Sequence, residues 1–282
     1  MRECATISRA ACLAEGIYEL WFKTEKIARK ARAGQFISIY CNDGTKLLPR
    51  PISICKIEGD EVRVVYRVAG GGTLEFSKMK AGDKLNIQGP LGNGYEIEKI
   101  EKETGLELSQ KGKHRAILFG GGIGIPPMLE LAREVNCDCE IVLGYRDNKT
   151  FLLDEFKELD KAGAADNLST DAGLLRKVNI NIATEDGSLG VKGNVLNAVD
   201  ELSIDGDIIM ACGPMPMLRA IKAYAAAKGI PAYISLEEKM ACGIGACLAC
   251  VCKTKDIDAH SQVNNTRICK EGPVFEASYV EI

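Results

Sequence analysis

The stretch "RAILFGGGIGIPP", residues 115–127, decides the fold of this chain. Its first half is a continuous apolar run, which is typical of a strand buried on both faces of a parallel sheet. A glycine-rich turn follows, and then two prolines, which suit the first turn of a helix. A buried strand that leads through a glycine turn into a helix indicates an α/β domain.

The residues after this stretch continue the same alternation. We expect helices over 126–136, 151–159, 193–202 and 216–229, and buried strands over 139–146, 178–184 and 207–214. Strands and helices that alternate in this way predict a doubly wound parallel sheet.

The residues before it have a different texture. Short runs rich in Val, Ile and Tyr, punctuated by Gly, Asp and Asn, predict strands over 16–24, 34–41, 51–68 and 83–90. The sequence "EGDE" at 58–61 reads as a hairpin turn between two of them. Closely spaced short strands favour an antiparallel barrel.

Composition and charge limit the class of protein. The chain has 282 residues, enough for two domains with cores of their own. A net charge of -3 favours neither a nucleic acid nor an anionic membrane as a partner. No apolar run approaches the roughly 18 to 20 residues of a membrane span, and residues 1–16 make a poor signal peptide. We therefore expect a cytoplasmic protein.

Twelve cysteines need an explanation other than disulfides in a cytoplasmic chain. Five of them crowd into the last 41 residues and predict a metal or cluster site. The others are scattered, and we expect them to be small buried hydrophobic residues: Cys4, Cys12, Cys41, Cys55, Cys137, Cys139 and Cys212.

The crowded cysteines follow a known spacing. Cys242-x4-Cys247-x2-Cys250 is the first part of the plant-type [2Fe–2S] pattern, and Cys269 is available as the later fourth ligand. A zinc site with four cysteines or an oxidised thiol cluster is the alternative, although zinc usually prefers two C-x2-C pairs and only one is present. Cys252 is left over, yet on a strand its side chain would share a face with that of Cys250.

Three segments could hold phosphate groups. Gly120–Pro127 could present helix amides to a pyrophosphate, although Ile125 replaces the third glycine of G-x-G-x-x-G. Arg50–Ile54 carries an arginine fork, and Val65–Phe76 leads through three glycines into a short helix. Taken singly, these segments could equally be a tight turn, an edge strand and a glycine loop at a barrel corner.

Together these segments, closed by "CGPMP" at 212–216, resemble the ferredoxin–NADP reductase superfamily over residues 1 to about 235. The resemblance implies a flavin-binding barrel and a nicotinamide nucleotide on the sheet. It places these residues at the cofactors: Arg50, Pro51, Ile52, Ser53, Tyr66, Arg67, Val68, Gly72 and Thr73 at FAD, and Gly121, Gly122, Gly124, Cys212 and Gly213 at NAD.

The segments "SLEEKMACGIGAC" at 235–247 and C-x-E-G-P-V-F at 269–275 resemble one family closely, the electron-transfer subunits of NAD-dependent dihydroorotate dehydrogenase B. The resemblance implies FAD, NAD and a [2Fe–2S] cluster on Cys242, Cys247, Cys250 and Cys269. It also implies a catalytic partner subunit with FMN, in a heterotetramer of two copies of each chain that acts in pyrimidine biosynthesis. The long gap between Cys250 and Cys269 and the extra Cys252 depart from that family.

The division that follows is an FAD-binding barrel at 1–103, a linker at 104–113, an NAD-binding domain at 114–235 and a cluster domain at 236–282. We expect no catalytic residue and no dihydroorotate site in this chain. Glu237 stands before the cluster loop and either approaches the flavin or is a solvated charge. Asp147 follows the second sheet strand, where an acid can bind a ribose, and it favours NAD weakly over NADP.

Two other functions stay open at this point. One is a flavin and iron–sulfur subunit of another NAD(P)H-dependent oxidoreductase, linked to ferredoxin or sulfide. The other is a redox or metal sensor without enzymatic activity, although retention of Arg50, Ser53, Gly72 and Thr73 argues against it.

Overall fold

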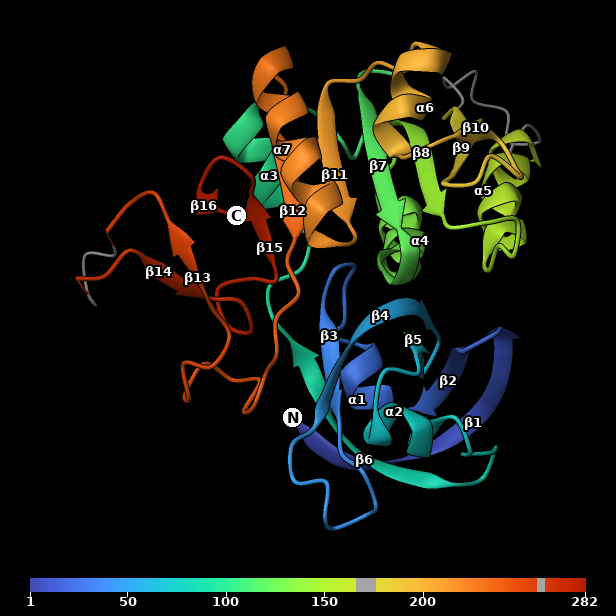
Figure 1. Cartoon of the computed structure of the whole chain (residues 1–282), viewed down its shortest axis with the longest axis vertical. Helices are drawn as coiled ribbons and strands as arrows, with labels where there is room; N and C mark the ends of the chain where they lie inside the picture. Colours follow the sequence, from blue (N-terminus) through green and yellow to red (C-terminus); the bar gives the residue numbers. More distant parts are fainter. Residues whose placement is uncertain (166–175, 258–261) are drawn as a thin grey trace. The chain divides into compact units, whose positions relative to one another are not determined.

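The computed structural model describes residues 1–165, 176–257 and 262–282. The chain divides into two compact units (Figure 1). The barrel unit comprises Met1–Tyr95, Ser235–Phe275 and Tyr279–Ile282, and the sheet unit comprises Glu96–Ile234 and Glu276–Ser278.

The barrel unit is built on a closed barrel with the strand order β1-β2-β5-β4-β3-β6, and neighbouring strands pair antiparallel all round it. Its core contains residues such as Ile7, Phe22 and Ile54, which are fully buried. The strands are β1 Arg2–Ala14, β2 Ile17–Lys23, β3 Phe36–Ile39, β4 Arg50–Glu58, β5 Glu61–Arg67 and β6 Lys84–Leu91; helices α1 Glu25–Ala28 and α2 Gly71–Phe76 lie between them. The predicted antiparallel barrel is confirmed.

Local predictions in the barrel had mixed outcomes. The hairpin at 58–61 is confirmed, because Glu58 pairs with Glu61 and Gly59 has φ +59, a conformation that glycine adopts easily. Strand β1 was not anticipated. The prediction that the scattered cysteines are buried is wrong for Cys4 and Cys12, which are exposed on β1. A barrel strand points alternate side chains outward, so small apolar residues can reach solvent there.

The sheet unit contains the parallel sheet expected from the sequence. The sheet order is β10-β9-β8-β7-β11-β12-β15, and the strands from β10 to β11 pair in parallel. Helix α4 packs beside α5, and α6 packs beside α7, as in a doubly wound sheet with two helical layers (Figure 1). The elements of this unit are β7 Arg115–Gly121, α4 Ile125–Glu134, β8 Asp138–Tyr145, α5 Leu153–Ala165, β9 Val178–Thr184, β10 Val191–Lys192, α6 Val195–Leu202, β11 Ile208–Cys212, α7 Met215–Lys228 and β12 Ala232–Ser235. The last strand of the sheet order is β15 Val274–Glu276, of which Glu276 belongs to this unit.

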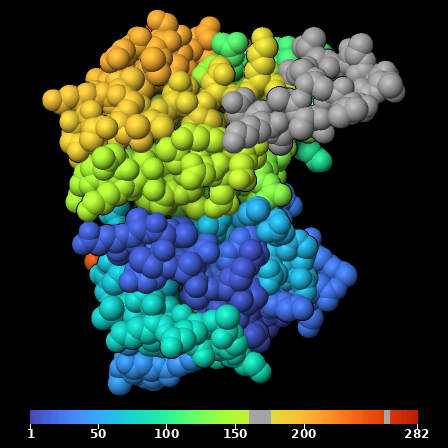
Figure 2. All heavy atoms as spheres, turned by 90° about the vertical axis from the view of Figure 1, so that its right-hand side faces the viewer, coloured from blue at the N-terminus to red at the C-terminus, as the bar shows by residue number. Residues whose placement is uncertain are grey.

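The space-filling view (Figure 2) shows the face of the sheet unit that carries the beginning of α5. Figure 2 shows yellow-green and yellow residues, which include α5 and β10, side by side there. Among the described residues, no helix is long and apolar enough to cross a membrane.

Just before the linker predicted at 104–113, the structure has a helix, α3 Ile97–Thr104, in the sheet unit. Ile100 of this helix is buried, and Gly105 ends it in a left-handed conformation. The helix was not predicted because its apolar stripe is short and most of its residues are charged. The four-part division at 103, 113 and 235 remains a prediction.

The C-terminal segment packs onto the barrel within the barrel unit. The Asn93 amide donates to the Gly272 carbonyl at 2.7 Å, and the Asn93 side chain donates to the Glu271 carbonyl at 2.8 Å. A Cβ on Gly92 would lie 2.5 Å from Pro273 Cδ, so the two segments meet backbone to backbone. The segment has a small sheet of its own, with β13 Val251–Thr254 between β14 Asn265–Arg267 and β16 Val280–Glu281.

Candidate redox site

The glycine turn of the sheet unit lies where β7 meets α4. Gly122–Gly124 forms a short 3-10 turn that continues into α4. Strand β11 runs beside β7, so that Cys212 pairs with Gly120 at the carboxyl ends of both strands. A Cβ on Gly124 would lie 2.4 Å from the carbonyl carbon of Cys212, which only glycine permits. The structure therefore brings the two sequence segments predicted for NAD to the edge where nucleotides bind in such sheets.

Met217, in the first turn of α7, covers this edge. Its Sδ would lie 2.4 Å from a Cβ on Gly121, and its Cε would lie 2.3 Å from a Cβ on Gly213. The thioether thus rests on both glycine turns at once. This residue was not predicted from the sequence, although its place three residues after Pro214 in a strand-to-helix turn was visible. Asp147, on the loop after β8, accepts the Lys149 amide at 2.8 Å and stabilises its own turn.

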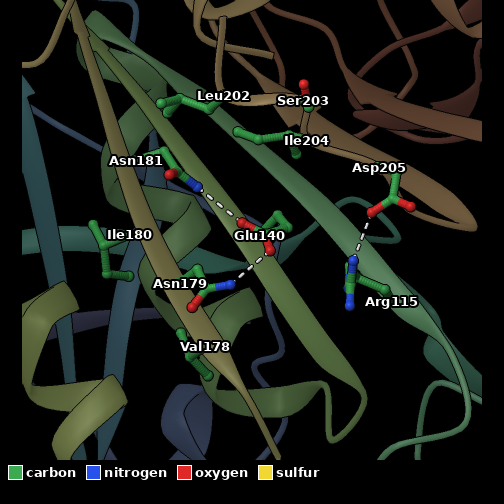
Figure 3. Close-up of a pocket in the computed structure, with 10 residues that line it drawn as sticks. All are labelled: Arg115, Glu140, Val178, Asn179, Ile180, Asn181, Leu202, Ser203, Ile204 and Asp205. Carbon is green, nitrogen blue, oxygen red and sulfur yellow. Dashed lines mark hydrogen bonds and ion pairs between the residues drawn. The ribbon is translucent and has the colours of Figure 1, made fainter. Parts of the chain in front are cut away.

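A hollow of about 480 Å³ lies around the starts of strands β7, β8 and β9 (Figure 3). Both carboxylate oxygens of Glu140 accept amide groups, from Asn179 at 2.7 Å and from Asn181 at 2.9 Å. Arg115 Nη1 donates to Asp205 at 2.6 Å. The charged side chains of this pocket are therefore paired with their own neighbours. It lies away from the glycine turns, and it gives no reason to place a ligand there.

The predicted flavin site gathers around the start of β4 and the start of α2. The Arg50 side chain lies against the backbone of Gly72, where a Cβ would come within 2.0 Å of Arg50 Nε. Arg50 also donates to the Leu48 carbonyl. The Thr73 hydroxyl accepts from the Ala69 amide at 2.9 Å and from the Gly70 amide at 3.2 Å, and so holds the glycine loop in place. A guanidinium on a bare glycine backbone suits the pyrophosphate of a dinucleotide.

The other residues predicted at the flavin occupy different positions. Pro51, Ile52 and Ser53 continue along β4 and are half-buried. Tyr66 lies in the barrel core, stacked on Tyr18 and edge-on to Phe76. Its hydroxyl has no hydrogen-bond partner among the described residues, and burial raises its pKa above the ordinary value. A buried hydroxyl without a partner fits a barrel that binds a polar ligand nearby.

Glu237 lies in the barrel unit, within reach of the charge of Arg67. Its side chain reaches solvent, but protein atoms crowd its carboxyl group. This desolvation raises the pKa of the carboxyl, while the charge of Arg67, at the exposed end of β5, lowers it in part. Val68 follows Arg67 and donates its amide to the Gly16 carbonyl at 2.9 Å.

The four predicted cluster cysteines lie close together in the barrel unit, in two pairs. The thiol groups of Cys242 and Cys247 interact, as do those of Cys250 and Cys269. Backbone amides point at the sulfurs: Gly245 donates to Cys269 Sγ at 3.1 Å, and Cys269 donates to Cys250 Sγ at 3.4 Å. Among the described residues, no three such ligands converge on a single metal-ion position. The charge of Cys242 also acts on Cys269, so the two pairs lie within reach of each other.

The pKa values separate these thiols. Desolvation raises the pKa of Cys242, but the amides of Ile244, Cys247 and Ala246 outweigh it and hold the pKa at about 6. Desolvation and contact with Cys250 raise the pKa of Cys269 to about 12.

The leftover Cys252 lies on β13, half-buried opposite Thr266. Burial raises its pKa to about 11, and of the other cysteines only Cys250 influences it. The structure thus brings four of the five crowded cysteines together and leaves Cys252 on the adjacent strand.

Comparison with known proteins gives matches over the whole chain. Residues 237–281 match the family model "iron-sulfur cluster binding domain of dihydroorotate dehydrogenase B", and residues 118–223 match "oxidoreductase NAD-binding domain". The chain is 36% identical over 286 residues to the dihydroorotate dehydrogenase B (NAD(+)) electron transfer subunit of Streptococcus mutans, covering 99% of this chain and 98% of the relative. It is 39% identical over 269 residues to the subunit of the same name from Caldanaerobacter subterraneus, covering 95% and 94%.

Solved structures agree on the fold. A NADH-dependent reduced ferredoxin-NADP oxidoreductase matches with a TM-score of 0.77 and 27% identity, over 98% of this chain and 89% of that one. A ferredoxin NADP+ reductase from Neisseria gonorrhoeae with bound FAD and NADP matches with a TM-score of 0.61 and 14% identity, over 84% and 94%. The second likeness supports the barrel-and-sheet fold alone.

Proposed function

Because this chain belongs to the family of electron-transfer subunits of NAD-dependent dihydroorotate dehydrogenase B, we propose that it carries electrons from the FMN of a catalytic partner subunit to NAD+. The route runs through a [2Fe–2S] cluster on Cys242, Cys247, Cys250 and Cys269 and through FAD in the barrel. The partner oxidises dihydroorotate to orotate, a step of pyrimidine biosynthesis.

One observation carries the proposal. The two cysteine pairs belong to a segment that is hydrogen-bonded to the barrel through Asn93, so the cluster ligands and the predicted flavin site form one compact unit. FAD exchanges a hydride with the nicotinamide, whereas the cluster passes single electrons. A unit that holds both ligand sets connects two-electron chemistry to one-electron chemistry.

The residues of the chain have separate tasks in this proposal. Arg50 and the Gly72 backbone hold the pyrophosphate of FAD, and Gly121, Gly122 and Gly124 approach that of NAD. Cys212 and Gly213 lie beside the nicotinamide, and Glu237 faces the flavin. The chain itself contributes binding, orientation and electrostatics, and the dihydroorotate site belongs to the partner.

The assembly and location follow the family. We infer a heterotetramer of two copies of each chain in the cytoplasm, with the cluster segment at the contact between partners. Several apolar side chains of this segment are exposed, which suits such a contact. They are Ile244, Leu248 and Val251.

The test is to purify the chain anaerobically with an FMN-containing dihydroorotate dehydrogenase subunit. We expect about one FAD and two irons per chain and dihydroorotate-dependent reduction of NAD+. A chain that holds both cofactors but neither associates with the partner nor reduces NAD+ in its presence would contradict the proposal.

A second candidate is favoured by one comparison. The likeness to a NADH-dependent ferredoxin-NADP oxidoreductase covers nearly the whole chain at 27% identity. The candidate is a flavin and iron–sulfur subunit that serves ferredoxin instead of an FMN subunit. Reduced ferredoxin that drives NADP+ reduction in the same preparation, without any response to dihydroorotate, would favour it.

A further inference from the structure

Arg267 lies two residues before the predicted cluster ligand Cys269 and reaches Gly245 in the cysteine loop. Its Nη1 donates to the Gly245 carbonyl at 3.1 Å. Glu271 holds this side chain in place, because its two carboxylate oxygens accept from Arg267 Nε at 3.1 and 2.9 Å. The same carboxylate accepts the Arg267 amide at 2.9 Å. The guanidinium is therefore fixed in one orientation.

Gly245 joins this arrangement to a cluster sulfur. Its carbonyl accepts from Arg267, while its own amide donates to Cys269 Sγ at 3.1 Å. Its φ of +83 is favoured by glycine, and a Cβ here would lie 2.9 Å from Lys270 Cβ. The two peptide groups of Gly245 flank one Cα, so the bond to Arg267 restrains the direction of the amide.

The base of this arrangement rests on the barrel. The Glu271 carbonyl accepts from the Asn93 side chain at 2.8 Å. A continuous series of contacts thus runs from Asn93 through Glu271, Arg267 and Gly245 to the sulfur of Cys269.

We propose that Arg267, clamped by Glu271, is a positioning residue that sets the reduction potential of the cluster by aiming the Gly245 amide at Cys269 Sγ. This inference rests on the proposed function. Hydrogen bonds to the sulfurs are one of the means by which a protein tunes an iron–sulfur cluster. An amide aimed at the thiolate stabilises the added negative charge of the reduced form, so it raises the potential. Because Glu271 neutralises the charge of the guanidinium, Arg267 affects the cluster mainly by fixing the direction of the Gly245 amide and less by its own charge.

Arg267→Lys separates geometry from charge. Lysine keeps the positive charge but lacks the planar fork that grips a carboxylate at two points. We expect a lower midpoint potential than in the unchanged chain, and a lower one still in Arg267→Gln. The measurement is an EPR-monitored redox titration of the full chain loaded with FAD and cluster.

Two further variants complete the test. Lys253→Gln removes a positive charge from the exposed face of β13 in the same segment and should leave the potential nearly unchanged. Glu271→Ala removes a negative charge, and this change of charge alone would raise the midpoint potential. We expect a lower midpoint potential instead, because Arg267 is released and no longer fixes the direction of the Gly245 amide. Glu271→Ala serves as the second variant if Arg267→Lys does not retain its cluster.

The proposed hydrogen bond has a signature of its own. The coupling of an exchangeable amide proton to the reduced cluster, seen by comparing samples in H₂O and D₂O, should weaken in Arg267→Lys. An Arg267→Lys potential equal to that of the unchanged chain would overturn the inference. A shift in Lys253→Gln as large as that in Arg267→Gln would overturn it as well, because the effect would then be one of charge. Failure of every chain to bind iron would instead contradict the proposed function.

Discussion

At the scale of single residues, the two cysteine pairs distinguish ligands from bystanders. The Cys269 thiol contacts that of Cys250, and its sulfur accepts a hydrogen bond from the Gly245 amide. Cys252, by contrast, lies on β13 opposite Thr266. We expect Cys269→Ser to lose the cluster and Cys252→Ser to keep it. Visible absorption and iron per chain measure both, with a loss of affinity of at least about tenfold in Cys269→Ser. Retention of iron in Cys269→Ser together with its loss in Cys252→Ser would show that the loop from 242 to 252 is self-sufficient.

The amides around Cys242 predict a pH-dependent reactivity. A pKa of about 6 leaves Cys242 a thiolate at neutral pH, whereas Cys252, with a pKa of about 11, stays protonated. In the chain stripped of iron, iodoacetamide should modify Cys242 at least about a hundredfold faster than Cys252 at pH 7. The rate at Cys242 should fall as the pH drops below 6, because protonation removes the thiolate. Peptide mass spectrometry measures both rates, and equal rates at pH 7 would contradict the lowered pKa.

At the scale of elements, the first turn of α2 depends on the absence of a side chain at Gly72. A Cβ there would overlap Arg50 Nε at 2.0 Å and displace the guanidinium from the turn. We expect Gly72→Ala to weaken FAD binding about tenfold, or about 1.4 kcal/mol. Flavin fluorescence titration of the deflavinated chain measures the change.

Gly70→Ala is the matched control for this turn. Gly70 has an extended backbone, with φ 179, and a Cβ there would meet no atom within 4 Å. Its affinity for FAD should equal that of the unchanged chain. If both variants bind FAD equally well, Arg50 does not hold the pyrophosphate.

The turn between β7 and α4 makes a similar prediction for stability. A Cβ on Gly124 would lie 2.4 Å from the backbone of Cys212, which cannot yield as a flexible side chain can. We expect Gly124→Ala to lower the free energy of unfolding by about 1–3 kcal/mol, as overpacking commonly does. Urea denaturation measures this, and Gly44→Ala, where a Cβ meets nothing within 4 Å, is the control. Equal stability of both variants would mean that the turn opens without cost.

At the scale of the whole molecule, the sequence predicted the elements that are buried over their whole length. The apolar runs at 115–121 and 139–145 are buried on both faces, so they read as strands of a parallel sheet, and the structure has them as β7 and β8. Helix α3 was missed because only one short stripe of it, around Ile100, is buried. A short helix with mostly charged residues has a sequence that looks like that of a surface loop.

The candidate site was predictable where spacing carries the chemistry. The spacing of Cys242, Cys247 and Cys250 by itself indicates a cluster, because it follows an iron–sulfur pattern. The contacts of Arg267 with Gly245 and of Met217 with Gly121 and Gly213 depend on which segments meet in space. A single sequence does not show which residues a returning loop will touch, so these roles emerge only from the folded chain.

The order of the cofactors makes the last prediction. If electrons pass from the partner through the cluster to FAD and then to NAD+, removal of the cluster interrupts only the first part of the route. Cys269→Ser should therefore keep its FAD and its NADH-dependent reduction of ferricyanide at the rate of the unchanged chain. Dihydroorotate-dependent reduction of NAD+ in the complex should be lost.

Steady-state rates in the two assays, with FAD per chain measured in parallel, test this order. Arg50→Ala is the opposite control, because it should lower FAD content and both rates together while iron per chain stays constant. A cluster-free complex that still reduces NAD+ with dihydroorotate would mean that the cluster lies outside the route, whatever its ligands. Cys269→Ser could also lose both activities while it retains FAD. The reaction between NADH and FAD would then depend on the cluster too, which would contradict the proposed separation of tasks between the barrel and the cysteine loop.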